Sequence, residues 1–132
     1  MTYTGGCHCG AVRYELEGPP NDVALCHCTD CRSHSGAPVM SWAGYDEDKL
    51  RVIKGTPKTF RMSPVSYRNF CGECGTGLFY RNSDILPGKV EVQSATLDDP
   101  EVMKPLAHIQ VAERLSWMHP SFTLPEVDRF PD

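Results

Sequence analysis

The spacing of the cysteines restricts the possible folds of this chain more than any other feature. The 132-residue sequence contains seven cysteines in three groups, which are the pair Cys7 and Cys9, the triplet Cys26, Cys28 and Cys31, and the pair Cys71 and Cys74. An odd number fits a complete disulfide framework badly. Closely spaced cysteines in a reducing compartment are more often metal ligands than disulfide partners. The sequence therefore predicts a fold that is stabilised by bound metal.

The triplet lies in the segment CHCTDCRSHSG, with the spacing C-x-C-x-x-C. Structural zinc sites are closed by four protein ligands, whereas catalytic zinc sites have three and leave a fourth position open. We therefore expect Cys26, Cys28 and Cys31 to bind a second, weaker and partly occupied zinc and to act in catalysis. Because thiolates are soft ligands, a thiol substrate suits the open position. The alternative is that His27, His34 or His108 completes a second structural site.

The other four cysteines form the second predicted site. The segment CGECG at Cys71 and Cys74 has the spacing of a zinc knuckle, a tight turn that directs both sulfur atoms inward. In an extended segment Cys7 and Cys9 would face the same side. Keeping the triplet together leaves these four cysteines for one closed structural zinc site, which would contribute folding energy directly. A redox role for Cys71 and Cys74 is disfavoured, because thioredoxin-like motifs occur in βαβ contexts that this sequence lacks.

One rival partition of the cysteines remains at this point. It combines Cys7 and Cys9 with Cys26 and Cys28, and it groups Cys31 with the third pair. This partition is less economical, because it divides a contiguous chelating segment.

Short segments rich in β-branched and aromatic residues predict a mainly β fold. Eleven glycines and eleven prolines separate them, and residues 11–18 alternate apolar and charged side chains. Further strands are expected within residues 22–28, 38–44, 58–62, 66–71, 77–82 and 89–95. Residues 45–55 are expected to begin with a helical turn capped by Asp46 and to end at Gly55, and residues 110–117 to hold another short turn. The sequence predicts no long amphipathic helix and a single domain over residues 1–132.

Composition and charge exclude several classes of function. Apolar residues make up 40% of the chain and charged residues 23%, which is typical of a soluble globular protein. No apolar run is long enough to span a membrane. The first residues lack the features of a secretory signal, so the cytoplasm is the expected compartment. The formal charge of −4 argues against nucleic-acid binding, which usually requires a basic surface.

Several polar residues near the triplet are candidates for the same site. Asp30 is expected either to hydrogen-bond a group that supports the ligands or to cap a turn. Arg32 and His34 follow the triplet and are candidates for the mouth of the site, Arg32 as a partner for a substrate carboxylate. His27 would point away from the ligands in a strand. For His108 a hydrogen-bonded core position is favoured over a role as a base.

The ordered motifs of this chain resemble one known family. The segments are GGCHCGAVRYELEG, CHCTDCRSHSG, RNFCGECGTGLFY, VQSATLDDP, HIQV and SW. Their order and spacing are similar to those of the glutathione-dependent formaldehyde-activating family, whose superfamily includes the centromere protein V domain. The resemblance implies an antiparallel β-tent fold with little helix. It also implies structural zinc ligands at Cys7, Cys9, Cys71 and Cys74, and catalytic zinc ligands at Cys26, Cys28 and Cys31.

The resemblance also implies an activity. The named enzyme of the family, S-(hydroxymethyl)glutathione synthase, is a carbon–sulfur lyase that joins formaldehyde to glutathione. We therefore expect a zinc-dependent carbon–sulfur lyase-type enzyme acting on a glutathione-like thiol and a small aldehyde or related electrophile. The alternative is a non-catalytic, zinc-stabilised protein-binding module, in which both zinc sites are structural. The sequence leaves open the oligomeric state and whether Cys28 is a ligand or a nucleophile.

Overall fold

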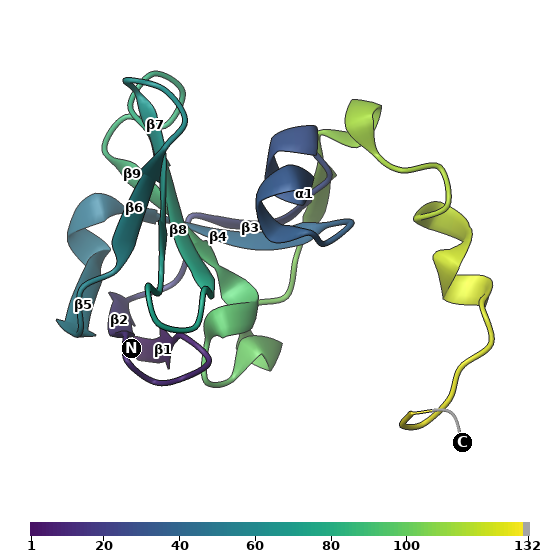
Figure 1. The fold of residues 1–132 in the computed structure, drawn as a ribbon, viewed down its shortest axis with the longest axis horizontal. Helices are drawn as coiled ribbons and strands as arrows, with labels where there is room; N and C mark the ends of the chain where they lie inside the picture. Colours follow the sequence, from purple (N-terminus) through teal and green to yellow (C-terminus); the bar gives the residue numbers. More distant parts are fainter. Residues whose placement is uncertain (131–132) are drawn as a thin grey trace.

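Two β-sheets form the body of the protein. A computed structural model describes residues 1–130. The smaller sheet is antiparallel, with the strand order β1 (Thr2–Gly6), β2 (Arg13–Glu17) and β5 (Leu50–Lys54). The larger sheet has the order β10 (Ala107–Ile109), β3 (Asp22–Cys26), β4 (Met40–Asp46), β9 (Lys89–Gln93), β8 (Gly77–Asn82), β7 (Ser66–Phe70) and β6 (Lys58–Arg61). Figure 1 shows β6 to β9 of this sheet standing nearly upright and β3 and β4 of the same sheet running across toward α1. The predicted mainly β, tent-like fold is confirmed.

Helical structure is sparse in the part of the chain that the structure describes. The α-helix α1 (Thr29–Ser35) follows β3 and packs beside β4. The remaining helical segments are short 3₁₀ turns, namely η1 (Glu47–Lys49), η2 (Ser94–Thr96), η3 (Pro100–Val102), η4 (Val111–Glu113) and η5 (His119–Thr123). None of the described helices is long and apolar enough to cross a membrane.

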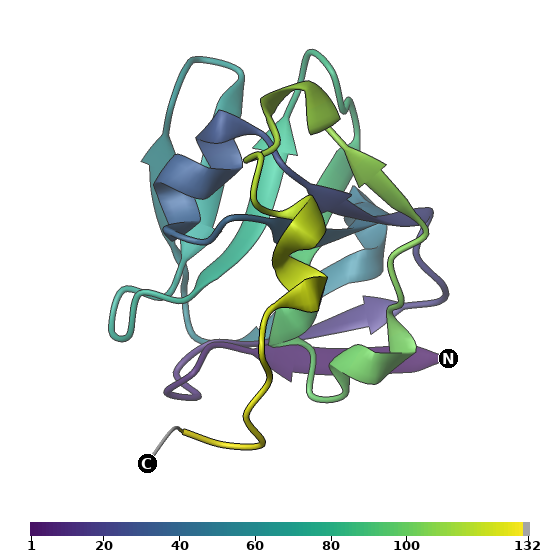
Figure 2. The same ribbon diagram turned by 90° about the vertical axis from the view of Figure 1, so that its right-hand side faces the viewer.

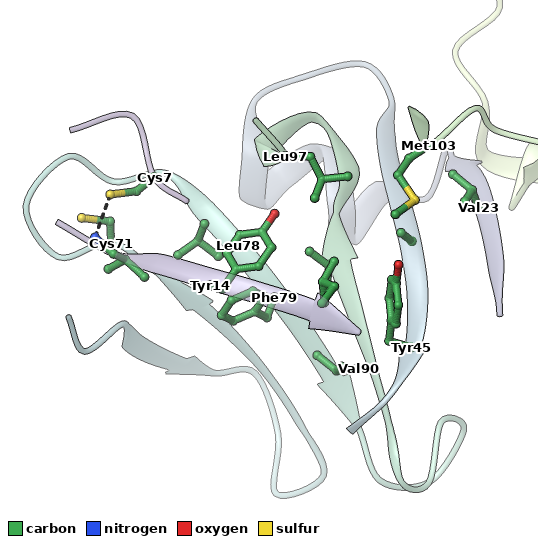
Figure 3. Close-up of a cluster of buried hydrophobic side chains, with 14 residues drawn as sticks. Cys7, Tyr14, Val23, Tyr45, Cys71, Leu78, Phe79, Val90, Leu97 and Met103 are labelled. Carbon is green, nitrogen blue, oxygen red and sulfur yellow. Dashed lines mark hydrogen bonds between the residues drawn. The ribbon is translucent and has the colours of Figure 1, made fainter. Parts of the chain in front are cut away.

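The core lies between the two sheets and follows from strand alternation. Tyr14 and Leu16 of β2 are fully buried, and Tyr14 meets Phe79 of β8 edge to face at 5.3 Å between ring centroids. Figure 3 shows this cluster, with Cys7 and Cys71 at one end and Val23, Tyr45 and Met103 at the other. Burial of each such side chain contributes roughly 1.5–3 kcal/mol. The cysteine turns are therefore anchored to the core itself.

The larger sheet has a second face that does not enter this core. Val23, Ala43 and Val92 point into the core, whereas their neighbours Ala24, Trp42 and Glu91 line a cavity on the opposite side. This division follows from the two-residue repeat of a strand. The second face of the sheet carries the polar groups described below.

Most of the expected elements are present where they were predicted. Every predicted strand segment contains a strand. Residues 45–55 contain the end of β4, then η1 and β5, and the segment ends at Gly55, whose φ is 76°. η4 lies within the second predicted turn. Asp46 does precede η1, but its carboxylate accepts hydrogen bonds from Asn21 and Lys89 and does not cap the turn.

Several elements were not predicted, namely α1, the strands β1, β5 and β10, and the 3₁₀ turns η2, η3 and η5. Two of the five residues of β1 are glycines, which weaken any strand signal. Strand β10 has only three residues and pairs in parallel with β3, an exception to the expected antiparallel arrangement. Helix α1 has seven residues, of which Cys31 is buried, and is therefore too short to produce an apolar helical pattern.

The chain after η4 extends beyond the body of the protein. In Figure 1 this yellow segment lies well to the side of the sheets, and Figure 2 shows it running down in front of them. Its apolar side chains are exposed, including Phe122 at 84% and Phe130 at 94%. We call residues 114–130 the C-terminal arm.

Candidate functional site

The structure brings Cys7, Cys9, Cys71 and Cys74 together between two turns. Their four sulfur atoms all lie within 4.8 Å of one another. The Cys7–Cys9 sulfur distance is 3.7 Å and the Cys9–Cys71 distance is 3.8 Å. A tetrahedral site with Zn–S bonds of about 2.3 Å requires sulfur separations of roughly 3.8 Å. The four-cysteine cluster therefore has the spacing of a metal site.

Backbone amides surround these sulfurs. The N–H groups of Glu73 and Cys74 point at the Cys71 sulfur from 3.4 and 3.5 Å, and that of Val12 at the Cys7 sulfur from 3.2 Å. Gly75 closes the turn with φ at 82°, a conformation that favours glycine. Hydrogen bonds donated to sulfur favour the charged thiolate that a metal requires. Both features match the predicted zinc knuckle.

The first pair of cysteines reaches the site in another way than expected. Cys7 and Cys9 were expected to lie on one face of an extended segment, but β1 ends at Gly6 and residues 7–10 form a turn. Gly10 donates a hydrogen bond to the Cys7 carbonyl at 3.2 Å and has φ at 81°. The two cysteine pairs therefore enter the site from two similar turns.

Cys74 shows how the turn favours a thiolate. The Thr76 hydroxyl lies 3.2 Å from the Cys74 sulfur. This hydrogen bond, aided by backbone amides, lowers the pKa of the Cys74 thiol to about 5. The donor set therefore suits a soft divalent metal.

The triplet is assembled by the junction of β3 and α1. Cys26 is the last residue of β3, Cys28 is the N-cap of α1, and Cys31 lies in the helix. The Cys31 amide donates to the Cys28 sulfur at 3.2 Å, and the Cys31 and Cys26 sulfurs are 3.6 Å apart. All three sulfurs lie within 4.8 Å of one another. This three-cysteine cluster is also spaced as a metal site would require.

Burial disfavours the negatively charged thiolate form of these cysteines unless a cation is bound beside them. Cys26 and Cys31 are 5% and 6% exposed. Burial raises the pKa of the Cys26 thiol to about 12 and also raises that of Cys31. A metal ion would supply the compensating positive charge. The residues present therefore fit a metal ion at both clusters.

No histidine within residues 1–130 joins the three sulfurs as a close fourth donor. His27 points away from the cysteines, as predicted, and its Nε2 lies 2.9 Å from Nδ1 of His108. His34 lines a separate groove with Phe60 and Phe70. His108 is hydrogen-bonded as expected, but it is exposed and not part of the core. The geometry therefore gives no support to a second site completed by histidine.

A cavity of about 330 Å³ opens beside the three cysteines. Its walls come from the second face of the larger sheet, α1 and the segment after β10. The residues that give it chemical character are Asp22, Trp42, Arg68, Tyr80, Glu91 and Gln110. The cavity lies next to three thiols and contains both charged and aromatic groups, so it has the composition of a small-molecule site.

Arg68 of β7 is a member of this site that the sequence analysis missed. Its side chain is 2% exposed, and Nη2 donates to Asp30 at 2.6 Å and approaches the Cys31 sulfur at 3.7 Å. The guanidinium lies 4.7 Å from the centre of the Tyr80 ring. Its Nε and Nη1 have no hydrogen-bond partner among the described residues. A cation at the centre of a strand of otherwise uncharged residues was the available signal.

Glu91 of β9 is the second member that was missed. Burial in the cavity, reinforced by the charge of Asp22, raises its pKa to about 7. In the sequence, the alternation of β9 marks Glu91 as a residue on an ordinary solvent-facing side. Only the tertiary structure shows that this side is a cavity wall.

Two residues near the triplet have definite structural partners. Asp30 accepts the hydrogen bond from Arg68, which confirms its expected supporting role. Arg32 was considered for the mouth of the site, but its Nη1 donates to the carbonyls of His27 and Glu113 at 2.7 and 2.6 Å. It joins α1 to η4 and is absent from the cavity lining, so a substrate-binding role for Arg32 is not supported.

Comparisons with known proteins agree with this geometry. The profile of the family described as glutathione-dependent formaldehyde-activating enzyme matches residues 2–113. A Halomonas elongata protein, named as a candidate enzyme of this kind, is 32% identical over 89 residues, which are 60% of this chain and 55% of that protein. The chain thus spans about half the length of this curated relative.

A solved structure supports the fold. The crystal structure of a Rhodobacter sphaeroides protein has a TM-score of 0.62 and 28% sequence identity, and the match covers 80% of this chain and 98% of that one. The family match includes both cysteine clusters and ends at Glu113, just before the C-terminal arm. This chain therefore belongs to the glutathione-dependent formaldehyde-activating enzyme family.

Proposed function

We propose that this protein is a zinc-dependent, carbon–sulfur lyase-type enzyme that combines a glutathione-like thiol with a small aldehyde or related electrophile. The observation that carries the proposal is the opening of the three-cysteine cluster onto a cavity with charged and aromatic walls. Family membership makes glutathione and formaldehyde the first substrates to test. We also propose a single domain over residues 1–132 and a cytoplasmic location, because all seven cysteines are free thiols that suit a reducing compartment.

The two clusters have different roles in this proposal. Cys7, Cys9, Cys71 and Cys74 hold a structural zinc that joins the first turn of the chain to the turn after β7. Cys26, Cys28 and Cys31 hold a second zinc beside the cavity. When bound there, zinc supplies positive charge that lowers the pKa of a thiol and a position that suits a soft sulfur ligand.

The reaction itself requires no external oxidant or reductant. The sulfur of the thiol forms a bond to the aldehyde carbon, and the π electrons of the carbonyl move to its oxygen. The thiol loses its proton and the carbonyl oxygen gains one, so the sum of protons is unchanged. Arg68 places a fixed positive charge beside Cys31, and Trp42 and Tyr80 provide apolar walls that exclude water. The chain thus holds the thiol in one position, which favours reaction with a small partner.

Cys28 has two possible roles. As N-cap of α1 it is partly buried and its sulfur accepts a hydrogen bond from the Cys31 amide, which suits a ligand. Its exposure also exceeds that of Cys26 and Cys31, which suits a nucleophile. X-ray absorption of the zinc-loaded Cys28→Ser variant separates the roles, because loss of a ligand changes the sulfur coordination number at the second site.

The test of the proposed function is exchange NMR of glutathione and formaldehyde. The uncatalysed thiol and aldehyde already equilibrate, so an enzyme must accelerate interconversion without changing the equilibrium. We expect faster exchange with the wild type and with the control Ser33→Ala, an exposed change on the same helix, than with Cys28→Ser. Normal circular dichroism and one retained zinc establish that the variant is folded. Equal exchange rates with and without the wild-type protein would refute the proposed enzymatic function.

One observation favours the alternative, a zinc-stabilised protein-binding module. The C-terminal arm exposes apolar side chains that a protein partner would cover, including Leu124 and Val127, each at 63%. In that case the second zinc is structural and four-coordinate from the outset, and added thiol leaves its coordination unchanged. Substitution with Co²⁺ distinguishes the two functions, because a thiol that enters the coordination shell alters the thiolate charge-transfer band.

A further inference from the structure

Two carboxylates converge over the middle of the larger sheet. Gly44 of β4 pairs with Asp22 of β3 on one side and with Glu91 of β9 on the other. A methyl group built on Gly44 would lie 2.3 Å from one Asp22 oxygen and 3.3 Å from one Glu91 oxygen. Both acidic side chains therefore bend toward the same point. The absence of a side chain at Gly44 provides the space that they occupy.

In the described part of the chain this acidic pair, Asp22 and Glu91, lacks the positively charged or hydrogen-bonding protein groups that usually lie beside two neighbouring carboxylates. Within residues 1–130, neither side chain makes a hydrogen bond or an ion pair with a protein group. Burial and the neighbouring Asp22 disfavour the charged form of Glu91, which raises its pKa to about 7. Two close carboxylates without a cation are electrostatically unfavourable, so the arrangement is suited to a cationic ligand.

Arg68 gives independent evidence that the same cavity takes a polar ligand. It lines the cavity near the cysteines, is 2% exposed, and has two nitrogens without acceptors. A buried donor without an acceptor is destabilising, and an acceptor on a ligand would reduce this cost. The cavity is therefore polarised, with a cation beside the cysteines, the acidic pair at the other end, and aromatic rings between them.

Strand geometry sets the distance between the two ends. Asp22 and Cys26 are the first and last residues of β3 and both line the cavity. Four residues of strand span about 13 Å. Glu91 is therefore well outside the roughly 3 Å within which it would exchange a proton with a thiol at the cysteines. A binding role explains its position and a role as general base does not.

We propose that Asp22 and Glu91 bind the ammonium group of the thiol substrate while its sulfur lies at Cys26, Cys28 and Cys31. The inference rests on the proposed function and narrows its substrate class. An ammonium group eight bonds from sulfur, as in a γ-glutamyl thiol, reaches about 10 Å in an extended chain. Together with a metal–sulfur bond of about 2.3 Å, this matches the span. Cysteine, with three bonds between sulfur and nitrogen, reaches only about 4 Å and is too short.

The experiment compares two thiols that differ in one group. Isothermal titration calorimetry measures binding of glutathione and of its des-amino analogue, in which a glutaryl group replaces the γ-glutamyl group, to the zinc-loaded wild type. We expect glutathione to bind about tenfold more tightly, which corresponds to about 1.4 kcal/mol, because its ammonium group gains hydrogen bonds to charged carboxylates. Glu91→Gln and Asp22→Asn should reduce this preference and leave the affinity for the analogue unchanged. The control Glu17→Gln, exposed and outside the cavity, should keep the full preference.

The outcomes distinguish this inference from the proposed function. Equal affinity of the wild type for both thiols would overturn the ammonium site while leaving a thiol-binding enzyme intact. An unchanged preference in both cavity variants would also overturn it, because the discrimination would then come from other residues. If neither thiol binds, the thiol function is overturned and this inference with it. The wild-type comparison requires no variant, so the test holds even if a substitution disturbs folding.

Discussion

Replacing Glu91 with glutamine should make the protein more stable at alkaline pH. In the folded state the pKa of Glu91 is raised from 4.5 to about 7, mainly by burial. The folded protein therefore retains this proton over a pH range in which the unfolded chain has lost it, and stability falls as pH rises through that range. Each unit of pKa corresponds to about 1.4 kcal/mol, so the full penalty is roughly 3 kcal/mol. Glutamine cannot ionise, so the Glu91→Gln variant does not incur this penalty.

The size of the effect depends on pH in a way that can be measured. At pH 5.5 the linkage relation gives an advantage of about 1.5 kcal/mol for Glu91→Gln, and at pH 8.5 about 3 kcal/mol. Urea denaturation of the zinc-loaded proteins should therefore show a midpoint higher by roughly 1 M or more at pH 8.5, and a smaller shift at pH 5.5. The control Glu17→Gln lies at the exposed end of β2, where Glu17 forms only a surface ion pair with Lys49 at 3.9 Å. It should change stability by about 0.5 kcal/mol or less at both values.

A specific result would refute this reasoning. If Glu91→Gln is no more stable than the wild type at pH 8.5, the Glu91 carboxylate is not destabilised by its surroundings. The convergence with Asp22 would then carry no electrostatic cost. A stabilised variant that also loses its preference for glutathione would instead show that the wild type retains an unfavourable carboxylate because binding requires it, a familiar trade-off between stability and function.

Three further predictions concern the metal clusters and the cavity. Cys71→Ser should be insoluble or lack a cooperative thermal transition, because the remaining ligands cannot replace the folding energy of a four-cysteine zinc site; a normally melting variant would contradict the structural role. Limiting chelator should release the second zinc first, so mass spectrometry should find Cys28 alkylated before Cys74, although Cys74 is more exposed; the reverse order would contradict the ranking of the two sites. Gly44→Ala should separate the two carboxylates, since its methyl group would lie 2.3 Å from the Asp22 oxygen, and calorimetry should show weaker binding of glutathione but not of the des-amino analogue.

Local patterns were sufficient to predict seven of the ten strands of residues 1–130 and the cysteine groups. The alternation of β2 is visible in the sequence because one face enters the core and the other does not. Chelating spacing is also local, so the grouping of Cys26, Cys28 and Cys31 required only neighbouring residues. The choice between this partition and its rival was an argument from economy, and the sulfur distances agree with the economical choice.

The charged residues of the cavity, Arg68 and Glu91, could not be predicted from local sequence patterns. Glu91 alternates with Val90 and Val92 and so resembles an ordinary solvent-facing residue. Arg68 is the single charged residue of β7, but the sequence does not indicate which groups it contacts. The role of both residues depends on four strands being adjacent in the order β3, β4, β9 and β8, and on β7 lying beside β8. No local pattern specifies that order, since the neighbouring strands β4 and β9 are far apart in the sequence, β4 ending at Asp46 and β9 beginning at Lys89. Helix α1 was missed for another reason, because its N-cap is a cysteine and not one of the usual capping residues.

The separation of the four structural cysteines along the chain has a consequence during translation. Cys7, Cys9, Cys26, Cys28 and Cys31 are all synthesised 40 or more residues before Cys71. At about 5–20 residues per second, the ribosome takes roughly 2–8 s to pass from Cys31 to Cys71. During this time Cys7 and Cys9 lack their two partners, while Cys26, Cys28 and Cys31 are already present together. Five thiols are enough for a four-thiolate site of the wrong composition, which must exchange ligands before the correct turn can bind. If these clusters bind zinc as proposed, we expect the timing of metal delivery relative to translation to affect the yield of correctly folded protein.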